Sequence, residues 1–131
     1  VGDLLFLAID NSTHQIDQDQ LEATRAALAE GLPTVALIHI PLSLPTLRGP
    51  VIEKWGHSIL MADPDRPGAS EEDTASTLEF PKLLGRAENL VAILCGHIHQ
   101  GHVDTLSPWA AQYLAPPAFA GECRLFEWTS L

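Results

Sequence analysis

Three continuous apolar runs, each followed by turn-forming or polar residues, constrain the fold of this chain most strongly. They cover residues 4–9 (LLFLAI), 34–40 (TVALIHI) and 90–95 (LVAILC). Apolar runs of this length, without alternation between apolar and polar residues, are typical of strands that are buried on both faces. A parallel sheet with helices packed on it provides that burial, so the sequence predicts an α/β fold.

The segment between the first two runs has clear helix signals. Asp17 is suited to the N-cap position, and Gln20 stands three residues later, where it completes a capping box. Gly31 is a natural C-terminal cap. We therefore predict a helix over residues 18–30, and a strand, helix and strand in this order typically form a right-handed parallel crossover.

Residues 43–76 do not continue this pattern. They are rich in Pro and Gly, contain the acidic cluster Glu71-Glu72-Asp73, and show no persistent period. A long irregular stretch inside a small domain is usually functional or mobile. We interpret it as a loop or lid inserted into a single domain of residues 1–131, with a short helical turn near residues 51–55. A disordered surface insertion is the alternative.

The remaining elements are less sharply marked. Ser76 with Glu79 could start a helix, but Pro81 is tolerated only in the first turn, so the start is ambiguous and we predict a short helix over residues 81–87. Residues 103–128 contain short apolar stretches separated by Pro and Gly, a pattern that predicts antiparallel strands, most clearly at residues 124–128. The expected fold is thus a mixed sheet flanked by helices, with antiparallel strands near the C-terminus.

Charge and cysteine content exclude several classes of protein. Seven Lys and Arg stand against 17 Asp and Glu, giving a net charge of −10, which disfavours a general nucleic-acid surface or an anionic-membrane surface. No apolar run approaches the roughly 20 residues that a membrane span needs. Two cysteines are too few for a disulfide framework. Cys95 ends an apolar run, so we expect a buried free thiol and a cytoplasmic location.

Histidines follow two of the predicted strands at the point where each strand ends. His39 closes the second run, and His97 and His99 come directly after the third. Ligands of open α/β sheets bind outside the carboxyl ends of the strands. If residues 97–99 are extended, the rings of His97 and His99 point to the same side. Imidazole is a common ligand of borderline metals, so the sequence predicts a metal site formed by these three residues.

The other histidines give weaker signals. A single histidine at a strand end is commonly a satisfied polar group, and only the joint placement at two strand ends favours a metal. His14 and His57 lie in polar loop contexts and are expected on the surface. His102 follows closely in the sequence GHIHQGH, and we assign it as a candidate substrate-binding residue.

The order of these motifs is similar to that of a known family. The sequence Gly-His-Ile-His at residues 96–99 resembles the C-terminal Gly-His-x-His signature of calcineurin-like metallophosphoesterases. Residues 37–42 (LIHIPL) resemble the preceding strand-end motif, in which a His before x-Pro is a metal ligand. Asp-Asn-Ser at residues 10–12, followed by Gln-Leu at residues 20–21, resembles a still earlier strand, loop and helix of that family.

This resemblance implies a hydrolase of phosphomonoesters or phosphodiesters with two divalent metal ions (Mn, Fe or Zn). His39 and His97 would bind one ion and His99 the other. Two such ions hold the phosphate ester and activate a hydroxide for in-line attack. The fold would be half of a calcineurin-like sandwich of two sheets.

The chain also departs from the family pattern. The family's upstream Asp-x-His, Gly-Asp and Gly-Asn-His motifs are missing, and Gly2-Asp3 is a dipeptide match at the wrong place. We therefore expect the C-terminal part of a phosphoesterase, inactive alone, to which no catalytic residue is assigned. An uncovered sheet face would lead to self-association or to pairing with a complementary N-terminal segment. The alternatives are an inactive interaction scaffold and a mononuclear site with three histidines.

Overall fold

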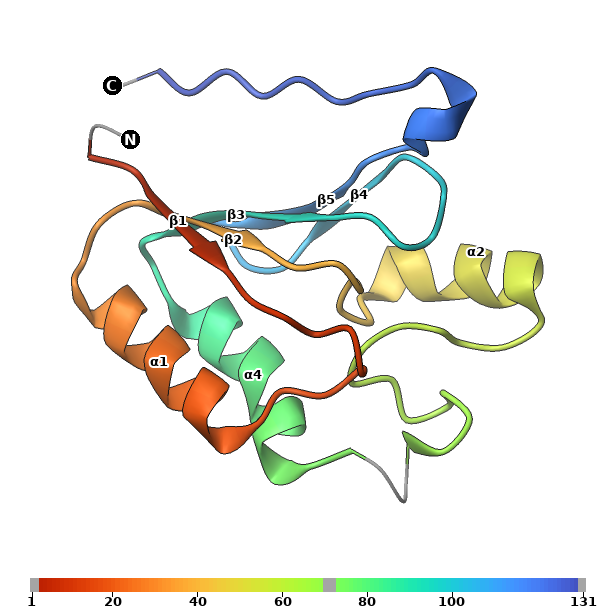
Figure 1. The fold of residues 1–131 in the computed structure, drawn as a ribbon, viewed down its shortest axis with the longest axis horizontal. Coiled ribbons are helices and arrows are strands. Elements are labelled where there is room, and N and C mark those ends of the chain that lie inside the picture. Colours follow the sequence, from red (N-terminus) through yellow and green to blue (C-terminus); the bar gives the residue numbers. More distant parts are fainter. Residues whose placement is uncertain (1–2, 70–72, 130–131) are drawn as a thin grey trace.

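A mixed five-stranded sheet forms the centre of the molecule, with the strands in the order β1-β2-β3-β5-β4 (Figure 1). The computed structural model describes residues 3–69 and 73–129. Gly2 of the Gly2-Asp3 dipeptide, and Glu71 and Glu72 of the acidic cluster, lie outside the described residues.

The pairs β1–β2, β2–β3 and β3–β5 are parallel, and β4 is antiparallel to β5. The strands are β1 (Leu5–Ala8), β2 (Thr34–Leu37), β3 (Leu90–Cys95), β4 (His102–Thr105) and β5 (Ala111–Leu114). Each apolar run therefore contains a strand, as predicted, although the first two strands are shorter than their runs. This confirms the α/β class and the mixed sheet.

Helix α1 (Gln18–Ala29) matches its sequence signals closely. The backbone N–H of Gln20 donates to Asp17 Oδ1 at 2.7 Å, and the Asp17 N–H donates to Gln20 Oε1 at 3.0 Å. Both halves of the predicted capping box are therefore present. Gly31 adopts the left-handed conformation, with φ of 76°, directly after the helix ends.

Helix α4 (Ala75–Arg86) begins earlier than the predicted helix over residues 81–87. The Thr74 side chain caps it by accepting a hydrogen bond from the Thr77 N–H at 3.2 Å. Pro81 therefore lies inside the helix, at a cost of about 3 kcal/mol relative to a good helix former. The fully buried side chains of Phe80 and Leu84 on either side of it offset this cost.

Helix α2 (Pro45–Trp55) occupies much of the segment interpreted as a loop or lid, so the structure extends the turn expected near residues 51–55. The carboxylate of Asp104, on β4, accepts hydrogen bonds from the Thr46 and Leu47 N–H groups, each at 3.0 Å. A carboxylate at a helix N-terminus is stabilising. Because the cap comes from a distant strand, it leaves no local signal in the sequence.

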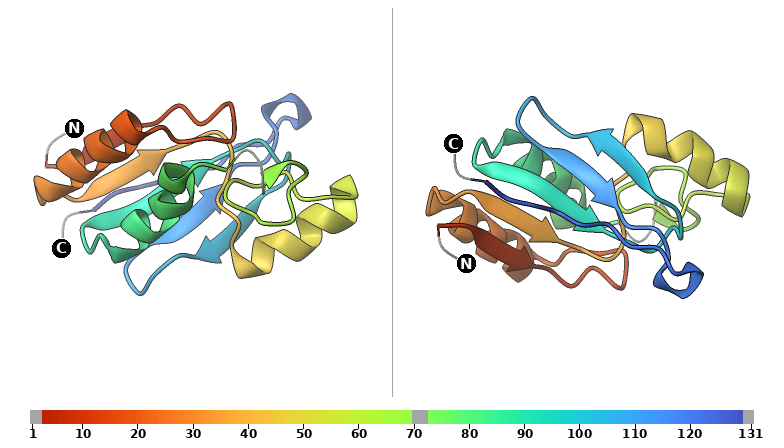
Figure 2. Two further views of the ribbon diagram at one scale, coloured as in Figure 1. Left: turned by 90° about the horizontal axis from the view of Figure 1, so that it is seen from below. Right: turned by 90° about the horizontal axis from the view of Figure 1, so that it is seen from above.

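The two faces of the sheet are covered differently. Helices α1 and α4 lie together against one face (Figures 1 and 2). Across the other face runs the segment at residues 122–129, which follows the short 3-10 helix η1 (Ala118–Ala120). It is not a strand, so the prediction at residues 124–128 is wrong. Ring packing attaches it instead, with the Tyr113 and Phe126 centroids 5.3 Å apart.

The hydrophobic core lies between the sheet and its two covering helices, and it includes the fully buried side chains of Phe80, Leu84 and Ile93. Cys95 is a buried free thiol, as predicted, and burial raises its pKa to about 12. In the described part of the chain, no helix is both long enough and apolar enough to cross a membrane.

Candidate metal centre at the carboxyl edge of the sheet

His39 is held at the carboxyl edge of the sheet by a buried asparagine. Asn11, which follows β1, accepts hydrogen bonds through Oδ1 from the His39 N–H at 3.0 Å and the Ile40 N–H at 3.1 Å. Its Nδ2 donates to the Ile40 carbonyl at 2.7 Å. The sequence marked Asn11 only as part of a turn. Because Asn11 is buried shortly after β1, its side chain can bind the backbone of His39 and Ile40.

The loop that carries His97 and His99 has an unusual backbone. His97 and His99 have φ values of 65° and 56°, in the left-handed region that costs non-glycine residues roughly 1–2 kcal/mol each. The condition considered for this segment, an extended backbone, is therefore not met. Ile98 between them is fully buried, and the Gly96 N–H donates to the His39 carbonyl at 3.1 Å. These contacts fold the loop back against the end of β2.

Two other imidazole rings contact the ring of His97. Its ring centroid lies 5.2 Å from that of His39 and 5.8 Å from that of His14, both in edge-to-face geometry. We call His14, His39 and His97 the imidazole cluster. The structure thus joins His39 and His97, as predicted, and adds the half-buried His14, which was expected on the surface.

Burial and the neighbouring histidines favour the neutral form of His97. Its pKa is lowered first by burial and then by repulsion from His39, His14 and His99. A metal binds only the neutral form of imidazole, so a lowered pKa leaves this ring ready to act as a ligand near neutral pH.

His99 lies in a different environment from His97. Its ring centroid lies 5.2 Å from Phe119, on η1, and 6.3 Å from Trp55, at the end of α2. We call Trp55, His99 and Phe119 the aromatic cluster. The predicted ligand His99 therefore has its ring contacts with aromatic side chains, although it is close enough to His97 to affect that residue's pKa.

The remaining predictions concern His102, as a substrate-binding residue, and His57, as a surface residue. His102 begins β4, and its Nε2 lies 3.0 Å from Thr46 Oγ1 and 4.0 Å from Asp104 Oδ2. These contacts hold the start of α2 against β4. His57 is exposed, as expected for a surface residue.

The donor groups at this edge are of a type that binds divalent metals, but they are too few for a complete ligand set. Neutral imidazoles are suitable ligands for Zn, Mn or Fe. Yet among residues 3–69 and 73–129, no three His, Cys, Asp or Glu side chains are arranged to hold a metal ion. Asp10 follows β1 at the same edge, and hydrogen bonds from Ser12 lower its pKa. The described side chains therefore do not form a complete metal site by themselves.

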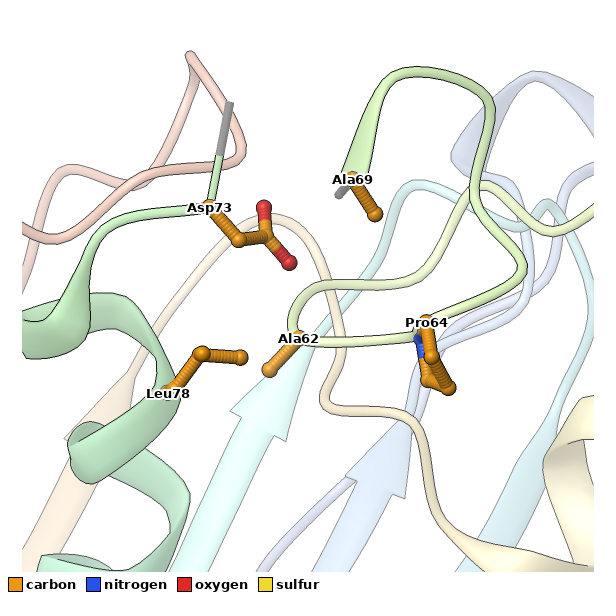
Figure 3. Close-up of a pocket in the computed structure, with 5 residues that line it drawn as sticks. All are labelled: Ala62, Pro64, Ala69, Asp73 and Leu78. Atoms are coloured by element: carbon orange, nitrogen blue, oxygen red, sulfur yellow. The ribbon is translucent and has the colours of Figure 1, made fainter. Parts of the chain in front are cut away.

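A shallow pocket of about 220 Å³ lies elsewhere, between α4 and the preceding loop (Figure 3). Its lining residues are Ala62, Pro64, Ala69, Asp73 and Leu78. Asp73 accepts hydrogen bonds from Arg66 at 2.6 Å and from Gln15 at 3.0 Å, which indicates a structural role for this carboxylate. The predicted metal ligands do not line this pocket.

No known protein family matches the chain, and no curated protein sequence matches it. Any family assignment therefore depends on the order of the motifs and on the geometry of the carboxyl edge.

Proposed function

We propose that this chain is the C-terminal part of a metal-dependent phosphoesterase that hydrolyses phosphomonoesters or phosphodiesters, with the fold of a calcineurin-like half-sandwich. One observation carries the proposal. The rings of His39 and His14 contact the ring of His97 at the carboxyl edge of parallel strands, where ligands of such sheets bind. The lowered pKa of His97 adds a neutral ligand at that position.

His39 and His97 would hold one divalent ion (Mn, Fe or Zn). The resemblance assigns a second ion to His99. When bound, such ions polarise the phosphate and lower the pKa of a coordinated water. The protein's own contribution is positional. Asn11 fixes the backbone on both sides of the His39–Ile40 peptide, and Gly96 ties the His97 loop to it.

The remaining ligands would come from a complementary segment. A four-coordinate metal needs more donors than two imidazoles, and a bridging carboxylate would reduce the repulsion between two cations. Exposed apolar side chains on two strands of the sheet favour such pairing or self-association: Phe6 on β1 is 41% exposed and Val103 on β4 is 48% exposed. A monomer in sedimentation at micromolar concentration would contradict this part of the proposal.

A cytoplasmic location completes the proposal, since both cysteines are free.

Metal titration tests the proposal directly. We expect Zn²⁺ or Mn²⁺, measured by calorimetry, to bind the chain, and His39→Ala and His97→Ala each to weaken binding at least about tenfold. His57→Ala, at an exposed site, is the matched control and leaves the affinity unchanged. Equal metal affinity in all three variants would remove the histidines from the proposed site. Hydrolysis of a chromogenic phosphodiester by the chain alone would show that no complementary segment is needed.

An interaction scaffold without catalysis is the second candidate. The incomplete ligand set in the described part of the chain favours it, as do the exposed apolar side chains on the sheet. The same titration separates the two functions. A scaffold self-associates without binding metal, whereas the proposed enzyme part binds metal through His39 and His97.

A further inference from the structure

The aromatic cluster is assembled from three separate parts of the chain. Trp55 ends α2, His99 belongs to the loop after β3, and Phe119 lies on η1. These parts meet at one end of the molecule, beyond the strand ends (Figure 1). The His99 ring is the common member, with a ring contact to each of the other two.

This cluster remains open to solvent. Phe119 is 81% exposed and Trp55 is 40% exposed. Single exposed apolar residues are ordinary on protein surfaces. Three rings brought together from three parts of the chain, and left uncovered, differ from that background because their faces and edges are available for stacking.

A lysine fixes the arrangement. Lys54 Nζ donates to the carbonyl oxygens of Ile98 and His99, each at 3.0 Å, and lies 5.5 Å from the centre of the Trp55 ring. It therefore ties the His99 loop to the end of α2. The ammonium group also places a positive charge beside the rings, in a chain whose net charge is −10. An anionic ligand is thus favoured locally at this edge.

We propose that the aromatic cluster binds the planar aromatic part of a phosphate ester whose phosphate lies at the imidazole cluster. This inference rests on the proposed function and names its substrate class. His97 belongs to the imidazole cluster and His99 to the aromatic cluster, and because only Ile98 separates them in the chain, their backbones are at most about 7 Å apart and the two clusters adjoin. The ligand is an aryl phosphate or a nucleoside phosphate, since both carry a planar ring next to a phosphate.

Stacking on such a surface has a measurable effect. Removal of one stacking side chain typically weakens binding of a base by about tenfold or more. We expect the chain, in the presence of Zn²⁺, to bind phenyl phosphate and adenosine monophosphate about tenfold more tightly than methyl phosphate. The relative affinity of the first two esters distinguishes the two ligand sources.

The experiment is a calorimetric titration of these three esters into the wild type and three variants. Trp55→Ala and Phe119→Ala remove rings of the aromatic cluster. Trp109→Ala is the matched control, because Trp109 is 41% exposed but lies in the connection between β4 and β5. Only the first two variants are expected to lose the preference for aromatic esters, with Zn²⁺ affinity unchanged in all three.

The outcomes separate this inference from the proposed function. Normal Zn²⁺ binding with equal affinity for all esters overturns the aromatic site and leaves the metal site intact. An equal loss in Trp109→Ala also overturns it, because a general effect of tryptophan removal would then explain the result. Failure of Zn²⁺ to bind, with a preference for phenyl phosphate that Trp55→Ala removes, supports the aromatic site and contradicts the metal site.

Discussion

The helix-covered core and the carboxyl edge of the sheet differ in burial and in backbone conformation. In the core, Phe80, Leu84 and Ile93 are fully buried, and α1 and α4 pack over the sheet with regular caps. At the edge, His14, His97 and His99 have left-handed backbone conformations, and the rings around them are half-buried or exposed. Burial in the core therefore raises the stability of the fold, and the left-handed backbone conformations at the edge lower it.

The difference shows where the backbone of this chain is strained. Left-handed conformations at non-glycine residues persist only where the surrounding structure enforces them, and such residues concentrate at functional sites. Among the described non-glycine residues, four have a positive φ: Ala62 lies outside the two clusters, and three histidines lie within them. Substitutions in the core should therefore lower stability without changing metal affinity. Substitutions at the edge should lower metal affinity.

The largest effect on stability is expected in the core. Phe80→Ala removes a fully buried ring and should lower the free energy of unfolding by about 3–5 kcal/mol, measured by urea denaturation. Leu78→Ala, on the same helix but 46% exposed, is the control and should change it by less than about 0.5 kcal/mol. Below the unfolding transition, the metal affinity of Phe80→Ala should equal that of the wild type. A weaker affinity there would show that core and edge are coupled.

Asn11 connects the two regions, so its loss should affect both. Asn11→Ala leaves the N–H groups of His39 and Ile40 without their acceptor and should cost about 1–3 kcal/mol, with weaker Zn²⁺ binding. The control is Asn89→Ala. Asn89 Nδ2 donates to the carbonyl groups of Leu28 and Leu32 at the other end of the sheet. It should lower stability without changing Zn²⁺ affinity, and a similar loss of affinity in both variants would remove the positional role of Asn11.

His97→Gly should separate stability from binding most clearly. Glycine adopts positive φ without strain, so the free energy of unfolding should rise by about 1 kcal/mol while Zn²⁺ affinity falls. His97→Ala should lose the affinity without the gain in stability. If His97→Gly unfolds more easily than the wild type, contacts of the imidazole ring outweigh the backbone strain.

Local sequence signals predicted the elements that depend on local interactions. The capping box of α1 and the three apolar runs are examples, because the residues that decide them are neighbours in the chain. The start of α4 was missed, since burial of Phe80 and Leu84 outweighs the cost of Pro81. Helix α2 was mostly missed because Asp104, far along the chain, caps it.

The candidate site shows the same division. Placement of His39 and His97 at two strand ends followed from the topology of parallel sheets, and their rings do lie together. His14 could not be placed from the sequence, because the residues that follow it are held by distant side chains, as in the hydrogen bond from the Ile16 N–H to Thr77 Oγ1 at 2.9 Å. His99 was predicted as a ligand from its place after the third strand and from the family resemblance. Burial of Ile98 bends the loop, and the His99 ring contacts Trp55 and Phe119.

The smallest effect concerns the dependence of stability on pH. Burial, followed by His39, His14 and His99, lowers the pKa of His97 below the value of about 6.5 that it has in the unfolded chain. Between these two pKa values the unfolded state binds more protons, so stability decreases as the pH falls below about 6.5. Above a pH of about 6.5 the His97 ring is neutral in both states, so this loss of stability is absent there. It is modest because the ring is only half-buried, and solvent screens its neighbours.

Urea denaturation of the metal-free chain at pH 7.5 and pH 5.5 measures this effect. His97→Gln removes the titrating group and should reduce the difference in the free energy of unfolding between the two pH values. His57→Gln, at an exposed loop position, should leave the difference unchanged. An equal reduction in both variants, or none in His97→Gln, would mean that the edge does not destabilise the protonated imidazole. The contrast with the core would then be a matter of backbone strain alone.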